Sequence, residues 1–583
     1  MNVLSRSGLV VVRTLGTLLP VEVVDTMATS IRIAARRGVE VKCGWVRWPE
    51  AAGRQQMQRL GFVAIVLIAW CNGPVGSAEP VTADVVLEGG EIHDGTGRPG
   101  VIGDVAIRGG KIVAVGTFKT QSVEWRLDCR GLVVMPGAID LHNHSDRQVV
   151  DAKTRACINY LMQGCTTMVT GNCGSGPVNV GEYYGKINQS GAGANVVHLL
   201  PQGSLRRQVV GTDRRAATSE ELQEMVRLAE KAMADGAWGM STGLIYVPGT
   251  YADTDELVAL AKVVARHNGI YASHIRNENV RLLKAVDEAM EIGRRAKLPV
   301  HVSHFKSSGR ESWGLVRRAA ERIAAARKAG QVVTADQYPY VASSTSLDAT
   351  VIPTWARAGG RKELIRRLDD KEVGQRIRTA IAENLSRKEN GRVLKIARYS
   401  PRSDWVGKSV AEIAEGEKLT TVEVAVQVAR NGGAAIVNFS MSEEDVRHIM
   451  QVKWVATASD GRAYLPGADR PHPRSYGTFA RKLGHYAIRE KVLGLPAAVR
   501  SMTGLPAKIL GLKDRGVLRV DSVADIAVFD PKAIRDAATF EDPHQYSEGF
   551  RYVFVNGRPA VFRGKPTGAL AGRAVVHEQE GVK

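Results

Sequence analysis

The sequence AIDLHNHSD at residues 138–146 is a short apolar run that ends in polar residues. Seven similar runs follow along the chain, and several are separated by sequence with helical periodicity, such as SEELQEMVRLAEKAMADG at 219–236. Short apolar strands that alternate with helices are typical of a buried parallel sheet. The candidate strands are 138–142, 166–170, 195–200, 237–242, 270–274, 299–304, 332–337 and 454–459. Eight strands in this pattern predict an α/β fold with a (β/α)8 TIM-like barrel.

The sequence on either side of the barrel strands predicts a second domain. Residues 79–135 and 508–583 alternate apolar and polar residues and break at glycines, which is typical of short strands with turns. We expect both chain ends to pair in one small β-sandwich domain. The barrel then comprises 136–346, with strands one to seven, and 451–507, with strand eight and the last helices. Charged, helix-like sequence predicts a helical insertion at 347–450, between strands seven and eight.

The first part of the chain contains the pattern of a secretory signal peptide at residues 57–78. An apolar run, LGFVAIVLIAW, follows Arg59 and precedes the small residues Gly76-Ser77-Ala78, after which we expect cleavage. The run is too short for stable insertion in a membrane, so we expect an exported protein, periplasmic or secreted. Since a signal peptide begins a chain, we hypothesise that residues 1–56 are a non-native upstream extension and that translation starts at Met57.

Composition excludes some classes of function. The net charge of the 583-residue chain is +19, but its basic residues are scattered and are not interleaved with aromatic residues, which argues against a nucleic-acid partner. The six cysteines form no CxxC pair and are too sparse for a disulfide scaffold. The sequence leaves open the oligomeric state and whether Cys129, Cys157 and Cys165 pair.

An unusual set of polar residues follows the predicted strands. In a TIM barrel the active site lies where the strands end, and residues two apart on a strand share a face. The first strand ends in His142-Asn143-His144, so both imidazoles can meet one metal ion. The whole set is His142, His144, Cys173, His274, His304 and Asp460. Imidazole, thiolate and carboxylate together predict a zinc site.

Each of these residues alone has a structural explanation. A single histidine at a strand end is usually a satisfied polar residue, and a single cysteine is usually a small buried hydrophobe. We interpret His198 as structural, and also His301, which alternation places on the opposite face from His304. The combination instead predicts hydrolysis, because a zinc-bound water has a pKa of about 7 in favourable sites. We expect Asp460 to be the general acid/base, although it could also serve only as a metal ligand.

Several longer motifs resemble those of the N-acyl-D-amino-acid deacylases (D-aminoacylases) of the amidohydrolase superfamily. The resemblance extends from about Val85 to Gly557. The motifs are PGAIDLHNHSD (136–146), GCTTMVTGNCG (164–174), GMSTGLIYVPGTYADTDEL (239–257), YASHIRNE (271–278), VHVSHFKSSG (300–309), DQYPYVASST (336–345), ASDGRAYLPGADRPHPRSYGTFARKLG (458–484) and MTGLPAKILGLKDRG (502–516).

The resemblance implies an activity, namely hydrolysis of N-acyl-D-amino acids to a carboxylate and a free D-amino acid. Most amidohydrolases use a carbamylated lysine on the fourth strand. The D-aminoacylases instead use a cysteine after the second strand, and this chain has Ser241 and Cys173 at those places. By similarity, Cys173, His274 and His304 hold the main zinc ion. His142 and His144, with Asp460, would line a second, weaker metal position.

The resemblance also implies how the substrate carboxylate is bound. The family uses a lysine, a tyrosine and an arginine, to which Lys306, Tyr338 and Arg474 correspond, with Tyr340 as the alternative tyrosine. Pro201 and Gln202 replace the family's usual Gly-His, and Ser145 replaces an aspartate, which leaves the substrate preference open. Other activities also stay open: a hydantoinase-like or dipeptidase-like amide hydrolase, or a non-catalytic binding protein on the same fold.

Overall fold

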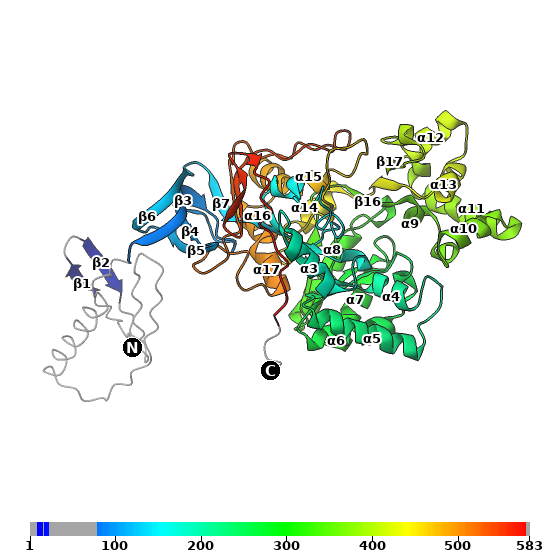
Figure 1. The fold of residues 1–583 in the computed structure, drawn as a ribbon, viewed down its shortest axis with the longest axis horizontal. Helices are drawn as coiled ribbons and strands as arrows, with labels where there is room; N and C mark the ends of the chain where they lie inside the picture. Colours follow the sequence, from blue (N-terminus) through cyan, green and yellow to red (C-terminus); the bar gives the residue numbers. More distant parts are fainter. Residues whose placement is uncertain (1–8, 15–16, 23–78, 579–583) are drawn as a thin grey trace, which may run out of the picture. The chain divides into compact units, whose positions relative to one another are not determined.

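The computed structural model describes residues 9–14, 17–22 and 79–578 (Figure 1). The chain divides into two units, 1–78 and 79–583. In the first unit, β1 (Leu9–Thr14) and β2 (Thr17–Glu22) pair antiparallel. The predicted signal peptide at 57–78 and most of the predicted upstream extension at 1–56 lie outside the described residues. Across the residues that are described, no helix has both the length and the apolar character needed to cross a membrane.

All eight predicted barrel strands are present, and they lie in two parallel sheets. The first sheet has the order β10–β9–β8 and the second the order β11–β12–β13–β14–β15–β19. The strands are β8 (Ala138–Asp140), β9 (Cys165–Thr170), β10 (Asn195–His198), β11 (Leu200–Pro201), β12 (Gly239–Gly243), β13 (Ile270–His274), β14 (Val300–Val302), β15 (Val333–Gln337) and β19 (Val455–Thr457).

The two sheets approach each other at both edges. The third predicted strand is divided into β10 and β11, which belong to different sheets. At the other edge, Asn143 after β8 and Gly461 after β19 form an isolated parallel bridge, and the amide of Asp460 donates to the carbonyl of His142 at 2.8 Å. The last residues of the first and eighth predicted strands are therefore neighbours.

The strands are followed by helices, as the alternating pattern predicts. After β9 to β14 come α3 (Val180–Ser190), α4 (Gln202–Val209), α5 (Ser219–Ala234), α6 (Thr254–Arg266), α7 (Leu282–Ala296) and α8 (Leu315–Lys328). Helices α5 to α8 pack against one another in chain order (Figure 1). Helix α5 begins at a capping box in which Thr218 and Glu221 bond to each other's backbone amides, which satisfies two amide donors that the helix leaves unpaired.

The two chain ends share one nine-stranded sheet, as predicted. Its order is β23–β22–β21–β20–β7–β3–β4–β5, with β6 beside β3. The link is β7 (Val133–Pro136), which pairs with β3 (Val81–Ile92) from the N-terminal side and β20 (Ile526–Phe529) from the C-terminal side. The remaining strands are β4 (Val101–Arg108), β5 (Lys111–Gly116), β6 (Thr120–Asp128), β21 (Phe550–Val555), β22 (Arg558–Phe562) and β23 (Lys565–Pro566).

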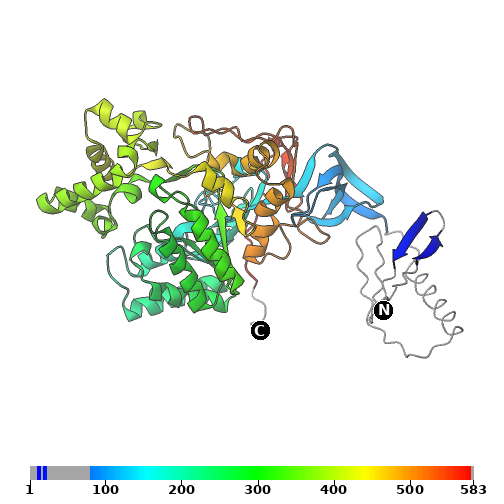
Figure 2. The same cartoon turned by 180° about the vertical axis from the view of Figure 1, so that it is seen from behind.

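The insertion protrudes at the opposite end of this unit from β3–β6 in both cartoon views (Figures 1 and 2). Its helices are α9 (Leu347–Val351), α10 (Arg361–Asp369), α11 (Lys371–Ser386), α12 (Val410–Glu417) and α13 (Thr421–Arg430), with a separate apolar core. An antiparallel sheet that the sequence pattern does not predict joins the insertion to the preceding chain: β16 (Ala342–Ser346), just before the insertion, pairs with β18 (Ala435–Phe439), which pairs with β17 (Leu394–Arg398). Such short apolar runs cannot be assigned to strand or helix from periodicity alone.

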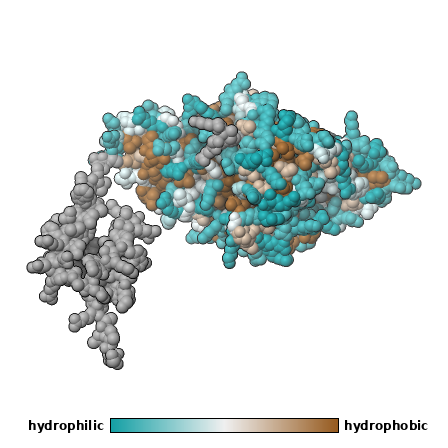
Figure 3. Space-filling view, turned by 90° about the horizontal axis from the view of Figure 1, so that it is seen from below, coloured by the Kyte–Doolittle hydropathy of each residue, from teal (hydrophilic) through white to brown (hydrophobic). Residues whose placement is uncertain are grey.

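The last helix of the insertion, α14 (Glu443–Ile449), leads to β19, and α15 (Arg474–Arg481) continues directly into the π-helical segment η7 (Lys482–Arg489). Helices α16 (Leu495–Met502) and α17 (Gly504–Leu510) follow, and they precede the C-terminal strands of the nine-stranded sheet. The face shown in Figure 3 is mostly hydrophilic, with apolar residues in scattered patches. The large apolar residues that are exposed include Val101, Ile102 and Trp125 in the nine-stranded sheet.

A buried ion pair offers a test of the packing around α4. Arg206 of α4 bonds to Glu256 of α6, and their side chains are only 0% and 5% exposed. We expect Arg206→Met to cost roughly 3–5 kcal/mol of unfolding free energy, because Glu256 would stay buried without its charged partner. Thermal unfolding should show a clearly lower midpoint. Lys186→Met is the control, since its pair with Glu182 is more than half exposed and should be worth about 0–1 kcal/mol. Equal midpoints for the two variants would show that burial of the Arg206–Glu256 pair has no special effect on stability.

Candidate metal centre

The first sheet supplies three of the predicted site residues. His142 and His144 follow β8 directly. Cys173 lies in the 3-10 turn η1 (Asn172–Gly174), which comes just after β9. Because β8 and β9 are parallel neighbours, both turns lie at the same edge of the sheet.

The second sheet supplies the other three. His274 is the last residue of β13, His304 follows β14, and Asp460 follows β19. All three side chains are at least nine-tenths buried. The structure therefore brings together residues as far apart in sequence as His144 and Asp460, whose side chains lie 3.1 Å apart.

Cys173 lies at the centre of the group. Its Sγ atom is 3.3 Å from Nε2 of His142, 3.6 Å from Nδ1 of His274 and 3.6 Å from Nε2 of His304. Tetrahedral zinc, with bonds of about 2.3 Å to sulfur and about 2.0–2.1 Å to nitrogen, separates those ligand atoms by about 3.6 Å. The three sulfur–nitrogen distances are therefore close to those around a tetrahedral zinc ion.

A second group of ligand atoms shares His142. Oδ1 of Asp460 is 3.1 Å from Nε2 of His144 and 3.6 Å from Nε2 of His142. The three residues could hold a cation, as could the trio of His142, Cys173 and His304, since the ligand atoms of each trio lie within 4.8 Å of one another. The residues that sequence similarity divides between two metal positions thus form one continuous cluster.

The backbone is strained at three of the site residues. Cys173, His304 and Asp460 have φ angles of 51°, 37° and 50°, in the left-handed region that residues other than glycine rarely adopt. Such strain persists only where the surrounding structure holds it, and it is frequent at functional sites. The backbone of Gly243 packs closely against Cys173 and helps to hold it in place. Any side chain at position 243 would clash, since its Cβ atom would lie 2.2 Å from the Cys173 carbonyl oxygen.

Electrostatics make Cys173 different from the other described cysteines. Burial would raise the pKa of its thiol, but His142 and the neighbouring imidazoles hold that pKa well below the ordinary value. Burial raises the pKa of Cys129 and of Cys157 to about 12, and it also raises that of Cys165. All four are free thiols, so no disulfide joins the cysteines that the structure describes. Cys173 alone among them has the thiolate character that metal binding needs.

The same charges act on the residues around Cys173. Burial would raise the pKa of Asp460, but Arg474 and the imidazoles of His142, His144 and His304 lower it well below the ordinary value. Burial would lower the pKa of His142, but Cys173 and Asp460 raise it well above the ordinary value. The carboxyl group of Asp460 is therefore ionised.

Two carboxylates beside the cluster were missed by sequence reasoning. Asp336, at the end of β15, accepts the backbone amide of His304 at 2.7 Å, and its Oδ2 lies 3.6 Å from Nδ1 of His142. Glu278 lies 2.8 Å from Nδ1 of His304 and 2.6 Å from Nζ of Lys306. Both residues belong to motifs quoted above, DQYPYVASST and YASHIRNE, and their place in those motifs is the only signal in the sequence that could have drawn attention to them.

The three residues predicted to bind a substrate carboxylate lie together next to the cluster. The ring of Tyr338 is 4.7 Å from the guanidinium of Arg474 and 5.8 Å from the ammonium of Lys306. Arg474 also pairs with Asp460, Nη1 to Oδ2, at 2.7 Å. The alternative tyrosine, Tyr340, instead lies against Arg481. Tyr338 is thus the tyrosine that accompanies both cations.

Two histidines interpreted as structural have different surroundings. His198 bonds to Thr170 and to the carbonyl of Pro177, outside the cluster. Nε2 of His301 donates to Oδ2 of Asp336 at 2.7 Å, so it contacts a carboxylate that also faces His142. It does not point away from the site region as strand alternation suggests, because β14 ends at Val302 and the chain then turns.

Tyr246 borders the cluster, whereas Gln202 bonds to a residue outside it. The ring of Tyr246, in the turn after β12, lies 5.1 Å from that of His274, a contact that sequence reasoning missed. At the unusual position Gln202, the side-chain amide donates to Glu256 at 2.9 Å. This replacement therefore takes part in the buried network of α4 and α6.

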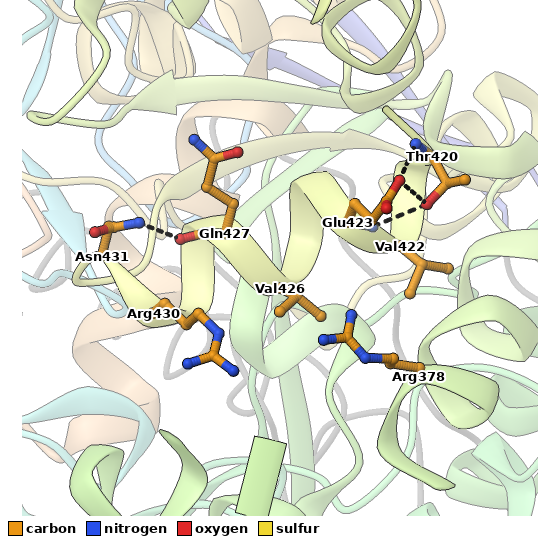
Figure 4. A pocket seen from close by; sticks show the side chains of 8 residues that line it. All are labelled: Arg378, Thr420, Val422, Glu423, Val426, Gln427, Arg430 and Asn431. Atoms are coloured by element: carbon orange, nitrogen blue, oxygen red, sulfur yellow. Dashed lines mark hydrogen bonds between the residues drawn. The ribbon is translucent and has the colours of Figure 1, made fainter. Parts of the chain in front are cut away.

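A surface hollow on the insertion lies elsewhere (Figure 4). It is lined by residues of α11 and α13, including Arg378, Glu423 and Arg430. It contains none of the residues that the sequence motifs assign to the site. The predicted site residues are instead gathered at the carboxyl ends of the parallel strands.

Comparison with known proteins identifies the family of the chain. Residues 127–561 match the model of the Amidohydrolase family. D-aminoacylase from Alcaligenes xylosoxydans xylosoxydans is 34% identical over 84% of this chain and 97% of its own length. N-acyl-D-glutamate deacylase from the same organism is also 34% identical, over 84% of this chain and 96% of its own length.

Solved structures of D-aminoacylases and related deacylases also resemble this chain. A crystal structure of D-aminoacylase superposes with a TM-score of 0.73 at 34% identity, covering 84% of this chain and 99% of that one. N-acyl-D-glutamate deacylase from Bordetella bronchiseptica, in complex with zinc and a phosphonate inhibitor, gives 0.72 at 31% identity, covering 85% and 100%. D-hydantoinase, at 15% identity and a TM-score of 0.52, shares only the fold. The chain belongs to the amidohydrolase family, and within it to the D-aminoacylases and related N-acyl-D-amino-acid deacylases.

Proposed function

We propose that this chain hydrolyses the amide bond of N-acyl-D-amino acids, giving a carboxylate and a free D-amino acid. The observation that carries the proposal is the position of the Cys173 thiolate, 3.3–3.6 Å from three imidazoles and next to the Asp460–Arg474 pair. The relatives named D-aminoacylase, N-acyl-D-glutamate deacylase and N-acyl-D-aspartate deacylase support the substrate class.

Zinc is the cofactor that these residues fit. In the assignment that we propose, Cys173, His274 and His304 hold the main ion, and His142, His144 and Asp460 line a second, weaker position. Zinc bound there would acidify a water molecule and polarise the scissile carbonyl. One solved D-aminoacylase structure concerns activation by one metal and attenuation by a second, which supports unequal positions in this chain.

Asp460 is the proposed general acid/base. Its carboxylate is ionised, is nine-tenths buried and lies within 3.6 Å of both His142 and His144. In this role it takes a proton from the attacking water and later gives that proton to the leaving amine. Arg474, at 2.7 Å from its Oδ2, fixes the orientation of the carboxylate.

The substrate carboxylate is proposed to bind between Lys306, Tyr338 and Arg474. Two fixed cations beside one tyrosine suit a planar anionic group, and the guanidinium of Arg474 can make paired hydrogen bonds to a carboxylate. Tyr338 is buried between the two cations and gives them an aromatic face. A free α-carboxylate is thus the part of the substrate that distinguishes an N-acyl-amino acid from a cyclic amide.

The proposal also covers the closure of the barrel, the β-sandwich, the domain bounds and the export of the chain. We propose that the two parallel sheets form one (β/α)8 barrel, which the bridge between Asn143 and Gly461 supports. We further propose that the nine-stranded sheet folds as a small β-sandwich, and that the domains are 79–135 with 508–583, 136–346 with 451–507, and the insertion 347–450. Export to the periplasm or the medium completes the proposal, with 57–78 as the signal peptide and 1–56 as an upstream extension.

A panel of substrates tests the activity. We expect the zinc-loaded protein to hydrolyse N-acetyl-D-amino acids faster than their L-enantiomers, and not to open cyclic amides such as hydantoins, which lack the free carboxylate. Cys173→Ala should lose both bound zinc and activity, because the thiolate is the central ligand. Product release and zinc content are the measurements. Preference for cyclic substrates would favour a hydantoinase-like activity, and full zinc and activity in the Cys173→Ala protein would refute the ligand assignment.

A single substitution tests the role of Asp460. We expect Asp460→Asn to lower kcat by about 10²–10⁴-fold, the usual contribution of a positioned general acid/base. Asp445→Asn is the matched control, because Asp445 is also buried and pairs with an arginine, Arg317, but lies outside the cluster. Steady-state kinetics at equal zinc content decides the matter. A normal kcat in the Asp460→Asn protein would mean that the Asp460 carboxylate has only a structural role.

The proposed processing can be checked on the protein itself. If residues 57–78 are a signal peptide, expression in a secreting host should yield a mature protein that begins at Glu79. N-terminal peptides identified by mass spectrometry provide the measurement. Peptides from residues 1–56 in the exported protein would contradict both the cleavage site and the upstream extension.

A further inference from the structure

Glu278 has a mostly buried carboxylate that no step of the proposed mechanism uses. It lies in the loop between β13 and α7, four residues after His274, and its side chain is 13% exposed. One of its oxygens, Oε1, is 2.8 Å from Nδ1 of His304 and 2.6 Å from Nζ of Lys306. A single oxygen therefore contacts a proposed metal ligand and a proposed substrate-binding residue.

The contact with His304 decides which nitrogen faces the cluster. Nε2 of His304 lies 3.6 Å from Sγ of Cys173, and Nδ1 is on the other side of the ring, toward Glu278. A carboxylate that accepts the Nδ1 proton leaves the Nε2 lone pair free for a metal ion. Carboxylates in this position also make the imidazole a stronger ligand.

The contact with Lys306 decides where the ammonium group lies. An ammonium group has three donors, and in Lys306 one reaches Glu278 while another reaches the carbonyl oxygen of His304 at 3.0 Å. Nζ also lies 2.9 Å from Nδ1 of His304, but a ring nitrogen that carries its proton toward Glu278 cannot accept another, so the third donor is left for a substrate carboxylate. The two bonds fix a side chain that would otherwise sample many rotamers, so the group is positioned before the substrate arrives.

We propose that Glu278 is a positioning residue that joins the metal cluster to the substrate-binding cations through His304 and Lys306. The inference rests on the proposed function for its Lys306 part, since only a carboxylate substrate needs that ammonium group. The His304 part does not depend on any substrate. In this role Glu278 itself touches neither the scissile bond nor the cleaved amine.

A purely structural role is less consistent with the surrounding contacts. The loop that carries Glu278 is already held by Arg276, which pairs with Glu288 of α7 at 2.9 Å and donates to the carbonyls of Thr250 and Ala252 at 3.0 Å each. These bonds do not involve Glu278. Glu288 therefore offers a matched control: a partly buried glutamate, paired with a cation, that contacts neither His304 nor Lys306.

The first experiment measures zinc without any substrate. Zinc affinity of the full chain, measured by competition with a chelator, should fall about 10–100-fold in the Glu278→Gln protein, the usual cost of losing such a supporting carboxylate. It should be unchanged in Glu288→Gln, and Glu278→Asp should recover part of the loss. An affinity within about twofold of the unaltered protein in Glu278→Gln would overturn the inference.

The second experiment is a double-mutant cycle on an N-acetyl-D-amino acid, with rates expressed per bound zinc. Glu278→Gln should lower kcat/KM at least about tenfold in the unaltered background, and by much less once Lys306→Met has removed the ammonium group. Fully additive effects would overturn the Lys306 part. If no N-acyl-D-amino acid is hydrolysed by the unaltered protein, the proposed function fails, while a loss of zinc affinity in Glu278→Gln still supports the His304 part.

Discussion

The structure depends on keeping the Cys173 thiolate in contact with several imidazoles in a place that water hardly reaches. An unpaired buried charge costs several kcal/mol, so a buried thiolate requires partners within hydrogen-bond distance. His142, His274 and His304 provide them at 3.3–3.6 Å. These partners come from three strands of two sheets, and only a parallel arrangement brings the ends of those strands to one edge.

The insertion helps to hold the cluster together, because it bonds to loops that follow the parallel strands β12 and β14. The carbonyl of Ser440, just after β18, accepts the amide of Gly309 at 2.8 Å and the indole of Trp313 at 3.0 Å, both in the loop after Lys306. On the other side, Tyr246 bonds to Thr345 of β16 at 3.0 Å. The antiparallel sheet formed by β16, β18 and β17 is thus attached to two loops that border the cluster. It fixes the loops whose residues would meet the substrate.

The sequence predicts those parts of the molecule that follow from local pattern. The eight strands are visible because apolar runs recur with helices between them, and the candidate metal ligands because each comes at or just after the end of such a run. The main misses, Glu278 and Asp336, are acidic residues whose partners, Lys306 and His142 among them, are settled only by the fold. The strands β16 to β18 are short and surrounded by helical sequence, so periodicity does not reveal them. Local pattern thus gives the candidate ligands, and tertiary packing gives the groups that would orient them.

The charges of the cluster explain why a divalent cation fits it. Cys173, Glu278, Asp336 and Asp460 are four anionic groups, because the pKa of each is held below its ordinary value, and they face two fixed cations, Lys306 and Arg474. The difference, four minus two, leaves two negative charges to be balanced. Without a metal ion the imidazoles must balance them by taking up protons. The pKa values of two imidazoles agree with this uptake of protons. Burial alone would lower both values, but Glu278 and Asp460 raise the pKa of His304 to about 9. Cys173 and Asp460 raise the pKa of His142 in the same way. A dication replaces two such protons and leaves neutral imidazoles with free lone pairs, the form in which histidine binds zinc.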